Sequence, residues 1–198
     1  MQRNYISGVN ALVFLVLLST VSCEPIYIPD PIDPRLPKYT ESGNNVAGAL
    51  INDKLWKSES YFDWFWVVSN DPSVFYLLDG DSVSIQFRGN TVGEAYGYGM
   101  ISFGLKNARV KSLASLQNLE GRKFELGNND NAVTLETGSG CNQWGTGQIY
   151  FRSVKYSSAR VVATISGTFG FDIVDPVCGN LSVTYGRFDM EISRIQGI

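Results

Sequence analysis

Cys23 is the residue whose surroundings specify a chemical modification most clearly. The apolar run ALVFLVLL occupies residues 11–18, and a short, mostly polar run of four residues separates it from Cys23. Eight apolar residues are too few to span a bilayer, which takes about 20, but they match the apolar region of a secretory signal peptide. We therefore expect residues 1–22 to be a lipoprotein signal peptide and Cys23 to be diacylated. The alternative is an ordinary signal peptide that leaves Cys23 as a free thiol.

The other two cysteines, Cys141 and Cys178, are candidates for a disulfide. With Cys23 committed to lipid, they are an even number in an oxidising compartment. Two buried free thiols are the alternative. The chain contains no histidine, and two cysteines supply only half of a structural zinc site, so we predict no metal and no cofactor.

The segment YFDWFW at residues 61–66 is the strongest candidate for a binding surface. It has five aromatic side chains in six residues, and a strand points alternate side chains to opposite faces. Tyr61 and Phe65 could therefore stack on sugar rings or a partner while Asp63 accepts hydrogen bonds from hydroxyl groups. In the alternative, Tyr61 and Phe65 pack under a loop and the other aromatics belong to the core.

Two further places carry side chains that could bind. Trp144 lies in a glycine-rich stretch close to Cys141, where it either binds a ligand or packs over the disulfide. Arg187 and Asp189 flank Phe188, and we expect them to form an exposed ion pair.

Enzyme chemistry has little support in the sequence. The absence of histidine removes the Ser-His-Asp and Cys-His nucleophile systems. A glycoside hydrolase needs only two carboxylates, so Asp63, Glu94 and Asp172 leave that activity as a remote alternative. We expect a protein that is not an enzyme.

Charge excludes one class of partner. The chain has 16 Lys+Arg and 19 Asp+Glu, and removal of residues 1–22 takes away Arg3 alone, which changes the net charge from −3 to −4. Nucleic acid requires a basic stripe, and no Lys/Arg cluster is present. The expected partners are the membrane, through the N-terminal lipid, and a glycan or an envelope protein.

Five of the seven prolines lie between Cys23 and Lys38. This composition predicts an extended spacer over residues 23–39, with a reach of up to roughly 45 Å at about 3.1 Å per residue. The remaining residues, 40–198, are predicted to form a single domain.

The domain is predicted to be mainly β, an antiparallel sandwich or flattened barrel built as a meander, with one short helix over residues 110–119. Asn52-Asp53 is a hairpin turn signal between two short strands. Odd positions from 161 to 173 are apolar or small, which is typical of a long half-buried strand. In the next strand the apolar residues change from odd to even positions at Gly186-Arg187, which predicts a β-bulge there.

The stretch GNNVAGALINDKLW at residues 43–56 resembles the opening strand of a large family of Bacteroidota lipoproteins with no assigned activity, in which a similar pattern follows a proline-rich spacer. ISGTFGF at residues 165–171 and YGRFDM at residues 185–190 resemble that family's closing strands. The resemblance implies a lipid-anchored β-domain, and it carries no catalytic residues.

These observations predict an outer-membrane lipoprotein, on either leaflet, with a binding role. Glycan binding through exposed aromatics and a structural or partner-binding role are the two alternatives. An exposed aromatic row with polar neighbours would favour the first, and a flat apolar patch of several hundred Å² would favour the second.

Overall fold

The structure is a computed structural model, and it describes residues 33–59, 73–78, 81–93, 98–127, 130–137, 142–176 and 179–196. Its elements in chain order are β1 (Val46–Ile51), β2 (Lys54–Ser58), β3 (Ser73–Leu77), β4 (Val83–Thr91), β5 (Tyr98–Leu105), the 3₁₀ helix η1 (Ala114–Leu119), β6 (Lys123–Leu126), β7 (Asn131–Thr137), β8 (Asn142–Ser157), β9 (Val162–Ile173) and β10 (Leu181–Ile192). The predicted mainly β domain with one short helix is thus confirmed for the described residues.

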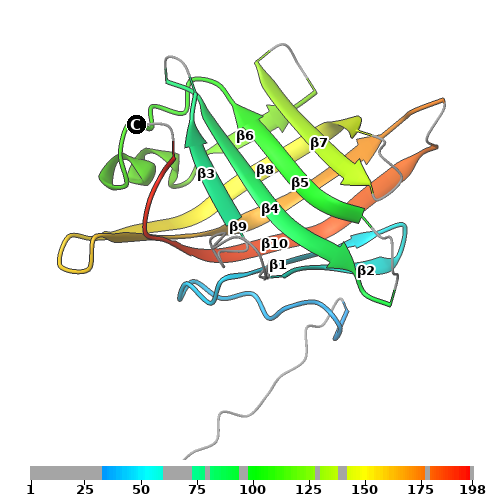
Figure 1. Cartoon of the computed structure of the whole chain (residues 1–198), viewed down its shortest axis with the longest axis horizontal. Helices are drawn as coiled ribbons and strands as arrows, with labels where there is room; N and C mark the ends of the chain where they lie inside the picture. Colours follow the sequence, from blue (N-terminus) through cyan, green and yellow to red (C-terminus); the bar gives the residue numbers. More distant parts are fainter. Residues whose placement is uncertain are drawn as a thin grey trace, which may run out of the picture.

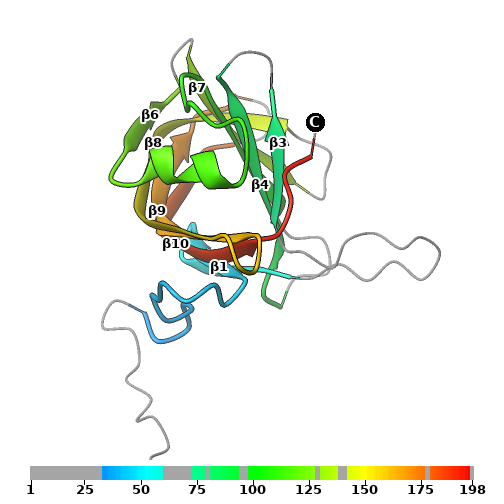
Figure 2. The ribbon, with the colours of Figure 1, turned by 90° about the vertical axis from the view of Figure 1, so that its left-hand side faces the viewer.

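The strands close into an antiparallel barrel. Neighbouring strands run in the order β2-β1-β10-β9-β8-β7-β5-β4, and β2 pairs again with β4 to complete a ring of eight (Figure 1). β3 adds to the free part of the β4 edge, and β6 pairs with β8 beyond the point where β7 ends. Figure 2 views this ring closer to end-on, with the strands around a common interior. Of the two predicted architectures, the barrel is the one observed.

Local sequence explains the first hairpin. β1 and β2 pair with Ile51 opposite Lys54, so Asn52 and Asp53 alone form the turn. Both turn residues have positive φ, 46° and 64°, as a type I′ turn requires, and asparagine and aspartate tolerate that conformation. The predicted hairpin is confirmed at these residues.

The β8–β9 hairpin has a longer connection than the β1–β2 hairpin. Ser157 pairs with Val162, so the connection has four residues, and Val161 takes a positive φ of 54°. A register shift between Phe151 and Ser153 then turns Ile149, Phe151 and Val154 all inward. Because β8 has one extra residue at this point, the odd-numbered Ile149 and Phe151 and the even-numbered Val154 can all face the core, which the alternation of a regular strand would not allow.

β10 contains the predicted bulge, two positions earlier than expected. Val183 pairs with Phe171 and Gly186 pairs with Phe169, so Thr184 and Tyr185 together face one residue of β9. Tyr185 has the positive φ of 53°. Gly186 is needed for a different reason, because a Cβ there would lie 2.4 Å from the ring of Phe169.

The barrel interior is filled by apolar side chains from every strand of the ring. Its centre is a group of phenylalanine rings in edge-on and stacked contact, with centroids 5.2–6.2 Å apart: Phe87, Phe103, Phe151, Phe169, Phe171 and Phe188. Trp56 of β2 is also fully buried there. Each such ring removes a large apolar area from water, and these contacts hold the barrel wall in place.

The helix is shorter than expected. η1 begins at Ala114 and is 3₁₀, because Ser112 and Ser115 exchange hydrogen bonds over the preceding turn and compete with a regular helical ladder. Leu116 and Leu119 of η1 are buried. The segment therefore packs on the barrel with the face that the apolar spacing predicted.

Residues 33–45 cross the outside of the barrel as a strap, drawn in blue under β1 in Figures 1 and 2. Leu36 is 2% exposed and packs with Leu50 and Leu55, which point outward from β1 and β2. Pro37 lies over Gly48, where any Cβ would come within 2.4 Å of the proline ring. The described part of the predicted spacer, residues 33–39, therefore packs on the barrel.

Candidate functional site

Trp144 is the most exposed aromatic side chain in the described part of the barrel. Trp144 is 69% exposed. It lies near the start of β8, between β7 and β9, both of which turn apolar side chains inward. Trp144 is opposite Thr134 of β7, and its neighbour Gly145 pairs with Ile173 at the end of β9. Successive side chains of a strand point to opposite faces. Gly145 faces the core beside Phe171 and Val133, so the side chain of Trp144 faces outward.

Polar side chains surround Trp144 on the same face. Thr146 and Gln148 follow it at alternate positions along β8 and are exposed. Thr146 pairs with Asp172 of β9, whose carboxylate accepts a hydrogen bond of 2.6 Å from the hydroxyl of Ser182. We call Thr134, Trp144, Thr146, Gln148 and Asp172 the Trp144 patch.

A second aromatic lies on the same wall, two strands away. Tyr185 is 52% exposed at the bulge of β10. The bulge faces Gly170 of β9, which in turn pairs with Gln148. From the strand rise and strand spacing, Trp144 and Tyr185 are roughly 16 Å apart, with polar residues and the side-chain-free Gly170 between them.

The strap is fastened to the wall by a buried carboxylate. Asp189 points outward from β10 and yet is 2% exposed. It accepts hydrogen bonds from the backbone N–H groups of Ser42, Gly43 and Asn44 at 3.1, 2.8 and 3.2 Å, and from the hydroxyl of Thr40. These four hydrogen bonds to one carboxylate hold residues 40–44 in one conformation.

Arg187 is the second charged residue under the strap. It is 7% exposed, and its guanidinium lies 3.4 Å from the carbonyl oxygens of Pro37 and Tyr185. The expected exposed ion pair between Arg187 and Asp189 is therefore wrong, because the strap covers both and each bonds to the strap instead. Alternation placed both on the outer face, and nothing in the local sequence indicated that residues 33–45 return to cover them.

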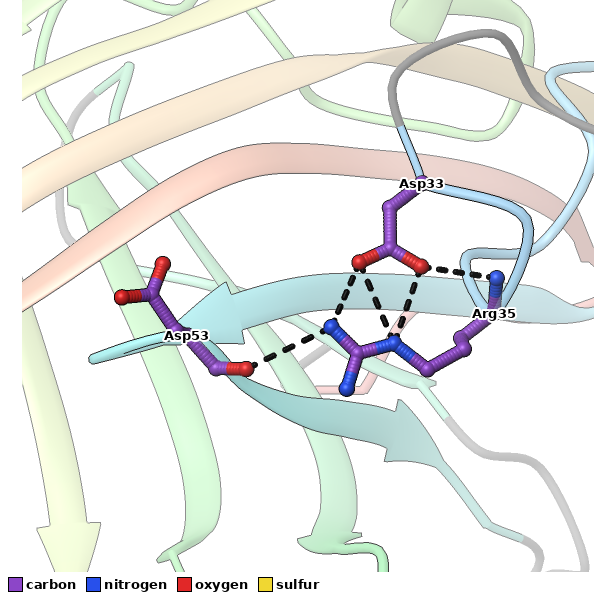
Figure 3. Close-up of polar contacts among 3 residues, drawn as sticks. All are labelled: Asp33, Arg35 and Asp53. Carbon is purple, nitrogen blue, oxygen red and sulfur yellow. Dashed lines mark hydrogen bonds and ion pairs between the residues drawn. The ribbon is translucent and has the colours of Figure 1, made fainter.

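The start of the strap is held by a clasp, shown in Figure 3. The carboxylate of Asp33 accepts hydrogen bonds from the backbone N–H of Arg35 at 2.8 Å and from its Nε at 2.9 Å, and the guanidinium also reaches the carbonyl oxygen of Asp53 at 3.5 Å. The side-chain hydrogen bonds from Arg35, and then its backbone N–H, lower the pKa of Asp33 to about 2. The clasp thus fixes Asp33 beside the β1–β2 turn.

The far end of the strap contacts β8. Glu41 forms ion pairs with Arg152 at 3.3 Å and Lys155 at 3.7 Å. The guanidinium of Arg152 lies 5.2 Å from the ring centroid of Tyr39, and burial raises the pKa of the Tyr39 phenol. The strap therefore spans the wall from the β1–β2 turn to β8.

Of the predicted site residues, Trp144 is described, and Cys23, Tyr61, Asp63, Phe65, Cys141 and Cys178 lie outside the described residues. The disulfide and the aromatic segment stay predictions. Trp144 is exposed, and its two alternatives, ligand binding and packing over the disulfide, stay predictions because Cys141 and Cys178 lie outside the described residues. Sequence reasoning missed Tyr185 and the patch threonines, although the even phase of β8 opposite its buried residues could have indicated them.

Of the carboxylates considered for hydrolysis, Asp172 is described. It is exposed and bonded to Ser182, whereas Asp63 and Glu94 lie outside the described residues. Within the described residues no group of three or more Asp, Glu or Cys side chains is placed to hold a metal ion. Nor does the described part of the chain contain a helix long and apolar enough to cross a bilayer.

Comparison with known proteins finds no family model, no curated protein and no solved structure that matches this chain. The candidate site is therefore argued from its own geometry.

Proposed function

We propose that this chain is a lipid-anchored protein of the cell envelope that binds glycans through the Trp144 patch. One observation carries the glycan part: a 69% exposed indole on a rigid strand, bordered by hydroxyl, amide and carboxylate side chains. A flat aromatic ring stacks on the apolar face of a sugar, and the polar neighbours exchange hydrogen bonds with its hydroxyl groups.

The geometry favours a glycan over a protein partner. A stable protein interface has an apolar core rimmed by polar groups. In the Trp144 patch a single aromatic lies among the polar side chains of Thr134, Thr146, Gln148 and Asp172, so the patch lacks an extended apolar core of that kind. The distance to Tyr185, roughly 16 Å by strand geometry, suits an extended oligosaccharide more than a single sugar.

The lipid part rests on the sequence around Cys23 and has its own test. Mass spectrometry of the mature N-terminus is expected to find a diacylglyceryl cysteine at Cys23, and Cys23→Ala is expected to release the protein from membranes. Cleavage elsewhere with an unmodified Cys23 would refute the anchor.

A glycan array tests the binding part. The wild-type protein should bind a defined subset of glycans, and Trp144→Ala should lose that signal while Leu78→Ala, which changes an exposed side chain elsewhere, should keep it. A parallel Tyr61→Ala/Phe65→Ala variant tests the aromatic segment. If only that variant loses binding, the patch is the wrong surface; if no variant binds less than wild type, neither surface is the site.

A further inference from the structure

The strap fixes the position of Asp33, the first described residue, on the barrel. The clasp of Asp33 and Arg35 on the carbonyl of Asp53, together with the buried Leu36, holds Asp33 beside the β1–β2 turn (Figure 3). The paired registers place the start of β8, the end of β9 and the start of β10 at this same end. We call this the anchor end of the barrel.

The anchor end also carries the most exposed apolar side chains in the described residues. Val174, which follows β9, is 80% exposed, and Trp144 is 69% exposed. Val92, 54% exposed, bonds through its backbone N–H to Leu55 next to the β1–β2 turn. At the opposite end Leu78 and Val161 are 47% and 55% exposed. Tryptophan is the side chain most suited to the boundary between lipid and water.

Chain length limits how the barrel can stand on a membrane. Ten residues lead from Cys23 to Asp33, and at 3.3–3.6 Å per residue they reach at most about 35 Å. β9 has 12 residues, which is about 37 Å of strand, and a barrel tilt near 40° makes the wall about 28 Å tall. If the barrel stood on its opposite end, the ten residues would have to run the height of the wall back to the membrane. This would stretch them almost fully, at a cost in conformational entropy.

We propose that the anchor end faces the bilayer that holds the Cys23 lipid, with Trp144 and Val174 at the level of the lipid headgroups. This inference rests on the proposed lipid anchor, and it narrows the proposed ligands to saccharides within reach of that membrane surface. Glu136 and Asp172, both exposed at this end, favour a zwitterionic surface over an anionic one.

Quenching of tryptophan emission by nitroxide-headgroup lipid tests the orientation. The full-length lipidated protein is reconstituted in phosphatidylcholine–phosphatidylethanolamine vesicles that contain no saccharide. The tryptophan emission of the wild type should be quenched more strongly than that of Trp144→Phe. Trp56 is fully buried, and the other tryptophans are the same in both proteins. In Trp144→Phe/Leu78→Trp, the tryptophan moved to the opposite end should stay unquenched.

Equal or stronger quenching at position 78, or no quenching of Trp144 in vesicle-bound protein, would overturn the orientation and leave the anchor intact. Protein that stays in the soluble fraction with an unmodified Cys23 would refute the anchor and the orientation together. Insertion of about 20 Gly/Ser residues after Glu24 gives a second readout. The longer tether should abolish the difference in quenching between a tryptophan at position 144 and one at position 78.

Discussion

Replacement of Asp189 by asparagine should loosen the strap and destabilise the barrel. The carboxylate accepts three backbone N–H groups and one hydroxyl while it is 2% exposed. An asparagine oxygen in the place of Oδ2 keeps the bonds to Thr40, Ser42 and Asn44 at the strength of a neutral acceptor. Its NH₂ group then faces the N–H of Gly43, which loses its partner.

The magnitude follows from these contacts. A hydrogen bond to a charged group contributes about 1.5–3 kcal/mol, a neutral one about 1, and a buried unpaired donor costs about 1–3. The unpaired N–H of Gly43 costs about 1–3 kcal/mol, and three bonds that weaken by about 0.5 kcal/mol each add about 1.5, so Asp189→Asn should cost about 3–4 kcal/mol. Urea unfolding followed by circular dichroism measures this as a lower midpoint at unchanged slope.

Asp172→Asn is the matched control, because that carboxylate is exposed and accepts one hydroxyl hydrogen bond. Its effect should stay near 0.5 kcal/mol. If Asp189→Asn costs no more than Asp172→Asn, the strap does not depend on the carboxylate and the reasoning is refuted.

Three further predictions concern the strap and the disulfide. The lowered pKa of Asp33 means that the clasp stabilises the fold fully above pH 3.8 and weakens as pH falls through about 2. In Arg35→Gln an NMR titration should find the Asp33 pKa raised toward 3.8, with the backbone N–H of residue 35 still lowering it, and an unchanged value would contradict the clasp. Gly48→Ala should destabilise by about 1–3 kcal/mol, since its methyl group would collide with the strap proline, and thermal unfolding no different from wild type would contradict that contact. Cys141 and Cys178 should resist alkylation in the unreduced, denatured protein, and the bridge they form should stabilise by about 3–4 kcal/mol.

The sequence was sufficient to predict elements whose cause is local. Asn52-Asp53 specifies its turn through backbone conformation, and the alternation in β9 specifies which side chains face the core. The β10 bulge was predicted from the same alternation, but its position depends on the close contact of Gly186 with Phe169, which is a contact between strands.

Features that depend on distant contacts could not be predicted. Ring closure through β1–β10 and β2–β4 joins segments far apart in the chain. Residues 33–39 of the strap belong to the predicted spacer, since five of the seven prolines lie between Cys23 and Lys38, yet Leu36 packs with Leu50 and Leu55 on the outer wall. The burial of Arg187 and Asp189 follows from that packing. The direction of Trp144 depends on the pairing of β8 with its neighbours, which leaves the side chain exposed.

The central claim is that the Trp144 patch binds a sugar ring by stacking. The direct measurement is a titration of the full-length protein with a glycan selected on the array, followed through tryptophan emission and calorimetry. We predict that binding changes the emission of wild type and not of Trp144→Phe, and that Trp144→Ala weakens affinity at least about tenfold, or about 1.4 kcal/mol. Unchanged affinity in Trp144→Ala, with an emission change that persists in Trp144→Phe, would contradict the claim.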